Sequence, residues 1–221
     1  MTPFDDPKAV ASYADNPPRL VPGFADMQRM ALLLLAERAP ADARILVVGA
    51  GGGLELKRFA EAQPGWRFDG VDPAAAMLAM ARATLGPLAA RATLHEGTVE
   101  AAPDGPFDGA SCLLTLHFVA ADERLSTLRE IRRRLKPGAP LVVAHHSIPR
   151  RDRAGWLARY AAFAASSGID PEKARAAAIA IDAKLPILSP EEDEALLTEA
   201  GFSDTALFHA GFTVRGWVAY A

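Results

Sequence analysis

The chain has 221 residues, a length that fits one ordinary domain with room for an insertion. Half of its residues are hydrophobic and its net charge is −3, so it can form a sizeable core and lacks the positive charge typical of general nucleic-acid binding. The single cysteine, Cys112, excludes an internal disulfide and is expected in the core. No apolar run is long enough to cross a membrane, and acidic Asp5 and Asp6 do not suit a signal peptide, so we expect a cytoplasmic protein with no membrane partner.

Residues 1–23 are rich in proline, aspartate and asparagine and predict an irregular N-terminal arm. Prolines in its second half are expected to prevent a continuous helix, at Pro17, Pro18 and Pro22. A helix is predicted over residues 24–38, because apolar residues recur there at helical spacing and Pro40 ends the pattern.

Residues 45–54 have the sequence Ile-Leu-Val-Val-Gly-Ala-Gly-Gly-Gly-Leu, which predicts a buried strand, a glycine turn and the start of a helix over 54–63. An aliphatic run that is apolar on both faces is typical of a central parallel strand. Glycines let the backbone approach a ligand closely, and a helix N-terminus offers backbone amides. We therefore expect a nucleotide-like ligand at the carboxyl end of this strand.

The spacing of the glycines narrows the choice of nucleotide. The pattern is G-x-G-x-G through Gly53, and Leu54 occupies the third glycine position of the dinucleotide fingerprint, which argues against a nicotinamide enzyme. The absence of G-K-[ST] excludes a P-loop. A second strand is predicted at 67–71 and ends in Asp72, and an acid about 20 residues beyond such a turn suits a ribose diol.

The rest of the chain first alternates strands with helices, which predicts a parallel sheet with right-handed crossovers. Strands are expected at 92–96, 107–116 and 141–145, and helices at 73–85 and 121–135. After Pro149 two helices follow without a strand, at 151–167 and 171–184. Ser189 is a good cap for a further helix, and residues 205–220 predict a closing hairpin.

The glycine turn, Asp72 and the stretch GVDPAAAML resemble class I S-adenosylmethionine (SAM)-dependent methyltransferases, and the LKPG turn at 135–138 resembles that family's entry to strand five. The resemblance covers roughly residues 40–150 and 187–221. It implies an α/β, Rossmann-like, mostly parallel seven-stranded sheet with helices on both faces, a C-terminal antiparallel hairpin and a helical insertion. It also implies SAM as the cofactor and a single domain over 1–221, with the insertion at 149–186.

The same resemblance implies a set of residues that hold SAM. The glycine turn would face the methionine part through Gly49, Ala50, Gly51 and Gly53. Asp72 would hold the ribose hydroxyls. The adenine would be bordered by Pro73, Met77, Thr98 and Val99. The reacting sulfonium would lie near Leu116 and His117.

Methyl transfer from a sulfonium is a direct displacement, so the protein mainly aligns the reactants and excludes water. A base is needed only if the acceptor arrives protonated. The candidate catalytic side chains are His117, His146 and Tyr13. Strand neighbours point to opposite faces, so one of His145 and His146 is expected to face the cleft, while the alternative for each histidine is structural packing. Arg19 is a candidate partner of the methionine carboxylate of SAM.

A closer resemblance, carried by residues 21–24, residues 114–118 and the insertion, is to carboxy-SAM-dependent tRNA-uridine carboxymethyltransferases. In that family an arginine of the insertion grips the extra carboxylate. Here Ala180 is near the aligned position and Arg175 is out of register, which favours plain SAM. No N-P-P-Y motif follows strand four, which argues against base amines and glutamine amides as acceptors.

We therefore expect a methyltransferase that acts on a small-molecule acceptor. The alternatives are a methyltransferase acting on RNA or protein, including a carboxy-SAM-type relative, and a SAM-binding module without catalysis. Nucleic acid is not the favoured partner, a homodimer stays open, and no ligand spacing predicts a metal site.

The first inserted helix predicts a lid. Trp156, Arg159, Tyr160 and Phe163 follow the spacing i, i+3, i+4 and i+7 and so share one face. We expect this face and the arm before Phe24 to roof the active site and form much of the acceptor pocket. The alternative is that these aromatic residues anchor the insertion to the domain or to a second subunit.

Overall fold

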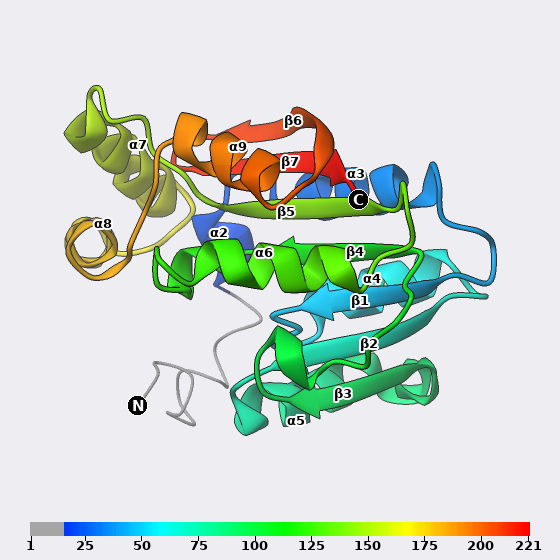
Figure 1. The fold of residues 1–221 in the computed structure, drawn as a ribbon. Coiled ribbons are helices and arrows are strands. Elements are labelled where there is room, and N and C mark those ends of the chain that lie inside the picture. Colours follow the sequence, from blue (N-terminus) through cyan, green and yellow to red (C-terminus); the bar gives the residue numbers. More distant parts are fainter. Residues whose placement is uncertain (1–15) are drawn as a thin grey trace.

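The fold of residues 16–221, taken from a computed structural model, is built on one seven-stranded sheet with the order β3-β2-β1-β4-β5-β7-β6 (Figure 1). The strands are β1 Arg44–Val48, β2 Arg67–Asp72, β3 Ala92–Glu96, β4 Gly109–Leu113, β5 Pro140–His146, β6 Ser203–Gly211 and β7 Val214–Tyr220. The first five pair in parallel, whereas β7 is antiparallel to both β5 and β6. The predicted sheet with its closing antiparallel hairpin is confirmed.

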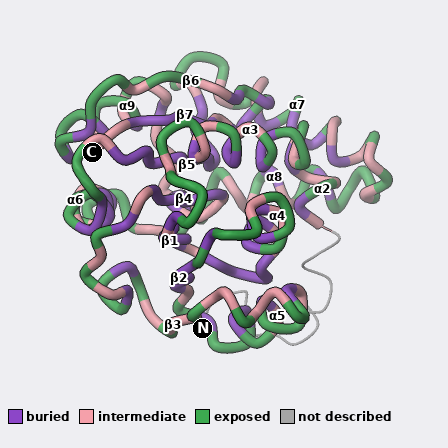
Figure 2. Tube along the Cα trace, turned by 90° about the vertical axis from the view of Figure 1, so that its right-hand side faces the viewer, coloured by how far each residue is buried: buried purple, intermediate pink, exposed green. Residues whose placement is uncertain are grey.

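Helices cover both faces of the sheet. They are α2 Pro17–Leu20, α3 Phe24–Ala36, α4 Leu54–Ala62, α5 Ala75–Leu85, α6 Arg124–Arg133, α7 Arg153–Ser166, α8 Pro171–Lys184 and α9 Pro190–Glu199. The apolar sides of α3, α4 and α5 pack on one face, and those of α6 and α9 on the other. Alternate residues of each central strand supply the two cores, and the central strands are buried along their length (Figure 2).

The insertion after β5 has a small apolar core of its own. Helices α7 and α8 lie beyond the carboxyl ends of the parallel strands, beside α2 (Figure 1). Ile148 and Tyr160 are among its buried members, and Leu20 of α2 packs against them. The chain then enters α9 through a capping box, in which the backbone N–H of Ser189 donates to the Glu192 carboxylate at 2.8 Å.

The arm contains one short helix that was not predicted, and one strand prediction was wrong. Pro17 and Pro18 begin the four-residue helix α2, because proline lacks only an N–H that the first turn does not use, and the helix ends before Pro22. The strand predicted at 107–116 ends at Leu113, because Leu114 adopts a left-handed φ of 58°. Residues Leu116–Phe118 then form a 3-10 turn, which changes where their side chains point.

Candidate functional site

A cavity of about 980 Å³ opens at the carboxyl ends of the parallel strands. Its walls come from the glycine turn after β1, Asp72 at the end of β2, residues 97–100 after β3 and His146 at the end of β5. The segment after β4, the start of α6, the short helix α2 and Tyr160 in the middle of α7 also contribute. Open α/β sheets bind ligands at this edge. The volume is near the top of the range of roughly 300–1,000 Å³ that small-molecule sites occupy.

The glycine turn needs glycine for two different reasons. Gly49 and Gly51 line the cavity and have φ values of 75° and 45°, a region that glycine enters without strain. A Cβ on Gly49 would lie 2.0 Å from Thr115 Oγ1, so no side chain fits there. Gly53 does not line this cavity. A Cβ there would lie 2.8 Å from Ala81 Cα, so glycine at this position permits the close approach of α4 to α5.

Ala50 also lies outside the main cavity. It lines a small neighbouring recess together with Gly53, Glu55 and Gln28. Gly51 of the turn lines only the main cavity, Ala50, Gly52 and Gly53 line only the recess, and Gly49 lines both.

Asp72 ties the end of β2 to the glycine turn. Its Oδ2 accepts a hydrogen bond from the Gly51 backbone N–H at 3.0 Å, and its Oδ1 accepts one from Ala74 at 2.9 Å. Burial raises the pKa of Asp72, and these two hydrogen bonds oppose the rise. The carboxylate lines the cavity with further lone pairs left for a ligand.

The predicted adenine-side residues also line the cavity, namely Pro73, Met77, Thr98 and Val99. Met77 and Val99 are buried and apolar, so they offer a surface suited to a flat ring. The Thr98 hydroxyl donates to the Glu100 carboxylate, which also belongs to the cavity wall.

The other end of the cavity holds two histidines and a tyrosine. The ring centroids of His117 and His146 are 4.8 Å apart, and Tyr160 of α7 meets His146 edge-on at 5.5 Å. The His146 backbone N–H donates to His117 Nδ1 at 3.3 Å, and His146 Nδ1 lies 3.0 Å from Thr213 Oγ1. These contacts fix both rings against the sheet.

All three side chains are uncharged at neutral pH. Burial lowers the pKa of His117 well below its ordinary value and lowers the pKa of His146 to about 4. Burial also raises the pKa of Tyr160 to about 12. His145 points to the opposite face, as alternation along β5 predicts, with its Nε2 3.1 Å from Asp193 Oδ1.

Besides Ala50 and Gly53, two predicted site residues do not line the cavity. Leu116 is buried beneath α6 against the core that contains Leu128 and Ile131, because the 3-10 turn directs it inward. The Arg19 guanidinium donates to the carbonyls of Ser167, at 3.1 Å, and Gly168, so it closes the carbonyl end of α7 instead of facing a cofactor. Tyr13 lies outside the described residues.

The aromatic side chains predicted on one face of α7 contact two different parts of the molecule, the cavity and the β6–β7 turn. Only Tyr160 lines the cavity. Trp156 has the guanidinium of Arg215 5.6 Å above its ring, and Phe163 lies 6.2 Å from Phe212. These two therefore anchor α7 to the β6–β7 turn.

Two polar residues that contact this region could not be identified from any pattern in the sequence. Thr213 reaches His146 from the hairpin turn, and the Ser111 hydroxyl of β4 donates to Glu55 Oε1 of α4 at 2.6 Å. Burial raises the pKa of Glu55 to about 8. Each pair joins positions that are distant in the sequence, so no local pattern could mark it.

The part of the chain that the structure describes contains no group of three or more His, Cys, Asp or Glu side chains placed to hold a metal ion. Within the same residues, no helix is both long and apolar enough to cross a membrane.

Comparisons with known proteins agree with this geometry. A family model described as "Methyltransferase domain" matches residues 45–138, and no curated protein sequence matches the chain. The chain is similar to a proposed O-methyltransferase from Nostoc punctiforme PCC 73102 (24% identity, 90% of this chain and 57% of that chain, TM-score 0.68). It is also similar to a SAM-dependent methyltransferase from Aquifex aeolicus (19% identity, 97% and 98%, TM-score 0.66).

Human N-acetylserotonin methyltransferase in complex with SAM is a further similar structure (20% identity, 87% of this chain and 51% of that chain, TM-score 0.61). This chain thus spans little more than half the length of several structures that it matches. Two of the similar structures, human N-acetylserotonin methyltransferase and a phosphoethanolamine N-methyltransferase from Haemonchus contortus, were solved with SAM bound. Residues 45–138 match a methyltransferase domain, and the described chain has the fold of the class I SAM-dependent methyltransferases.

Proposed function

We propose that this protein transfers a methyl group from SAM to a small-molecule acceptor. One observation carries the proposal: a single cavity of about 980 Å³ reaches from the glycine turn and Asp72 to His117, His146 and Tyr160. A cofactor end and an acceptor end in one cavity are what a direct transfer between two bound molecules needs.

At the cofactor end, this chain's residues bind and orient. Gly49 and Gly51 line the cavity where the methionine part of SAM would lie. The Asp72 carboxylate accepts hydrogen bonds from the ribose hydroxyls, and Met77 and Val99 border the adenine. When bound, SAM supplies the electrophilic methyl group.

At the acceptor end, the protein aligns the acceptor and excludes water. We propose that α2 and α7 form the roof, because Leu20, Val21 and Tyr160 all line the cavity. Arg19 joins these two helices through the carbonyls of Ser167 and Gly168. The whole chain then acts as one domain, with residues 149–186 as its lid.

Plain SAM suits the cavity better than carboxy-SAM. The described lining carries three acids, Asp72, Glu100 and Glu123, and no lysine or arginine. A carboxylate on the reacting carbon would therefore be buried there without a cation, which is costly. Arg175 is exposed on α8 and is not part of the described lining.

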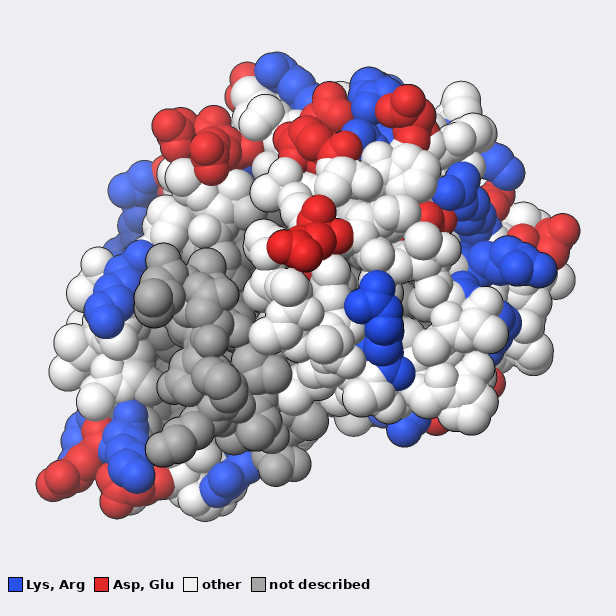
Figure 3. Space-filling model, turned by 90° about the horizontal axis from the view of Figure 1, so that it is seen from below, with Lys and Arg blue, Asp and Glu red and all other residues white. Residues whose placement is uncertain are grey.

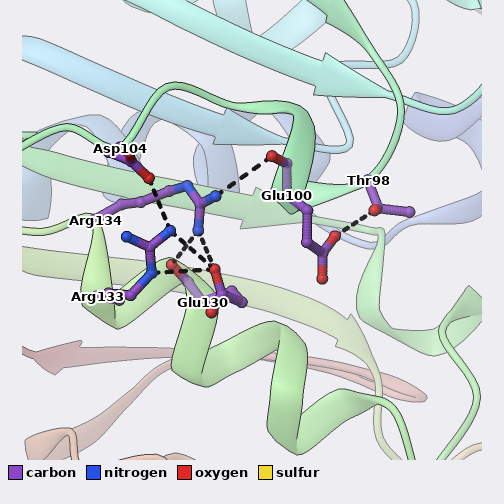
Figure 4. A network of polar contacts seen from close by, with 6 residues as sticks. All are labelled: Thr98, Glu100, Asp104, Glu130, Arg133 and Arg134. Carbon is purple, nitrogen blue, oxygen red and sulfur yellow. Dashed lines mark hydrogen bonds and ion pairs between the residues drawn. The ribbon is translucent and has the colours of Figure 1, made fainter.

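A small molecule suits the surface better than nucleic acid. Lysines and arginines are interspersed with acids on the face seen in Figure 3. The basic end of α6 is engaged internally: Arg133 binds Asp104, and both Arg133 and Arg134 bind Glu130 (Figure 4). These arginines hold the loop after β3 against α6, so they do not form a free basic patch.

Calorimetry with SAM and its demethylated product tests the cofactor site. We expect micromolar affinity for the unaltered protein, and Asp72→Ala should weaken binding by roughly 5- to 150-fold, because ribose hydroxyls lose a charged acceptor. Asp69→Asn is the matched control, since Asp69 lies on the same strand but binds Arg44 and His95. Unchanged SAM affinity in Asp72→Ala would refute the assignment.

Transfer itself is tested with SAM labelled in the methyl group. The protein is incubated with pooled small metabolites, RNA and protein fractions, and the label is followed. We expect label in small molecules. Label in RNA or protein would overturn the acceptor class, and SAM binding without any transfer would indicate a binding module.

A further inference from the structure

We propose that Thr213 and the backbone N–H of His146 hold the two cavity histidines as a pair of hydrogen-bond donors, each with its proton on Nε2. The pair then donates hydrogen bonds to a lone-pair oxygen of the methyl acceptor and does not remove a proton from it. As the new bond to the methyl carbon forms, the carbon–sulfur bond breaks, and any proton that the acceptor releases leaves to solvent through the mouth of the cavity. The proposal rests on the proposed function and names the acceptor class: a small, uncharged molecule with a carbonyl or hydroxyl oxygen.

The tautomer of His117 follows from a backbone group. The His146 N–H can only donate, and it lies 3.3 Å from His117 Nδ1, so this nitrogen must accept. A neutral imidazole carries one proton, which is then on Nε2. His117 lines the cavity, and Nε2 is the ring nitrogen that is left to donate to a bound molecule.

The tautomer of His146 follows from a buried hydroxyl. Thr213 is fully buried, and among the described residues the recorded partner of its hydroxyl is His146 Nδ1, at 3.0 Å. A buried O–H without an acceptor is costly, so the hydroxyl donates and Nδ1 accepts. The proton of His146 is therefore also on Nε2.

The hairpin holds Thr213 in place for this role. His146 pairs with Val214 across β5 and β7, and the Ser147 backbone N–H donates to the Thr213 carbonyl at 2.8 Å. Thr213 does not line the cavity. It is thus a positioning residue, which acts on the acceptor only through His146.

The pair offers donors and no free base. Each ring has its Nδ1 lone pair engaged and its Nε2 protonated, so neither nitrogen can take a proton from a bound molecule without losing a hydrogen bond. Each ring has an Nε2–H donor, and the described lining has no lysine or arginine to balance an anion. An uncharged oxygen with free lone pairs fits this set of groups.

Nitrogen NMR of histidine-labelled protein tests the proposal at neutral pH with S-adenosylhomocysteine bound. Protonated and unprotonated ring nitrogens resonate far apart, so each tautomer is directly visible. Signals are assigned with His117→Gln and His146→Gln. We expect both histidines as single Nε2–H forms in the unaltered protein. Thr213→Val should shift the His146 Nδ1 resonance and lower its Nε2–H to Nδ1–H ratio by about three- to tenfold.

Thr213→Ser keeps the hydroxyl and should restore the original His146 spectrum. Thr205→Val places the same substitution elsewhere in the hairpin and should leave it unchanged, as should the signal of His95, which binds Asp69. An Nδ1–H form in the unaltered protein, or an unchanged His146 in Thr213→Val, would overturn the proposal. The readout needs no turnover and SAM affinity is measured separately, so failure here is distinct from failure of the proposed function.

Discussion

Glu55 is a carboxyl group that the fold keeps neutral. It lies beneath the glycine turn, where it accepts a hydrogen bond from the Ser111 hydroxyl, and burial raises its pKa from 4.5 to about 8. Between these two values the unfolded chain releases the proton while the folded protein keeps it. Stability is therefore unaffected by Glu55 below about pH 4.5 and falls as the pH rises toward 8.

Glu55→Gln should remove this pH dependence, because glutamine keeps the oxygen that accepts from Ser111. The variant should match the unaltered protein near pH 4.5 and exceed its unfolding free energy near pH 8, on the order of 4 kcal/mol. Denaturant unfolding across this range is the measurement, with Glu61→Gln on the exposed side of the same helix as control. A constant difference at every pH would contradict the neutral carboxyl.

The roles of His117 and His146 can be separated by chemistry. Glutamine keeps an N–H donor but cannot act as a base, whereas alanine has neither property. If the histidines position the acceptor, His146→Gln should retain transfer within about tenfold and His146→Ala should lose more. Initial rates with the acceptor found by labelled transfer are the measurement. Equal losses of roughly 10²–10⁴-fold in both variants would instead identify a general base.

At the scale of elements, one face of α7 both borders the cavity and packs against the β6–β7 turn. Tyr160 borders the cavity, while Trp156 and Phe163 hold the helix on the β6–β7 turn. We expect Tyr160→Ala to leave SAM affinity within about threefold and to change acceptor turnover, because this side chain borders the cavity beside His146, away from the glycine turn.

Trp156→Ala should lower the melting temperature, by roughly 2–4 °C for each kcal/mol lost, and reduce turnover of all acceptors alike. Tyr160→Phe keeps the ring and is the matched control. Melting curves and competition between two acceptors distinguish the variants. Identical behaviour of Trp156→Ala and Tyr160→Ala would show that α7 is only packing.

The element predictions succeeded where local pattern decides the outcome. Residues 92–96 and 171–184 were predicted with their observed bounds, because turn residues flank the strand and Pro171 begins the helix at its Asp170 cap. The end of β4 could not be predicted, since the left-handed φ of Leu114 is held by tertiary contacts such as its N–H donating to Ala144.

The same distinction holds for the site. Gly49, Gly51 and Asp72 could be found because the turn, strand and acid recur at fixed spacing. Arg19 could not be assigned, because its long side chain selects the carbonyls of Ser167 and Gly168, which no spacing relates to it. Contacts across the fold, and not local propensity, determine where such side chains lie and what they bind.

At the scale of the whole molecule, cofactor binding should stabilise the fold. The cavity joins the carboxyl ends of β1, β2, β4 and β5 to α2 and α7, so a ligand there contacts most of the structure. S-adenosylhomocysteine at about 100 times its dissociation constant should add about 2.7 kcal/mol and raise the melting temperature by roughly 5–10 °C. Differential scanning fluorimetry measures this, and NAD should give no shift.

The position of β7 determines how late in synthesis the sheet can be completed. In the finished sheet β7 lies between β5 and β6, although β6 precedes it in the chain. While the ribosome is still synthesising residues 203–211, β7 has not yet been made. The segment that becomes β6 therefore has no neighbouring strand to pair with, and the edge of β5 that will pair with β7 is unpaired. Nascent chains halted before Val214 should therefore display an unpaired strand edge, the kind of surface that chaperones bind and that joins to other chains. The half of the sheet that carries His146 is thus completed only after Tyr220 has emerged from the ribosome.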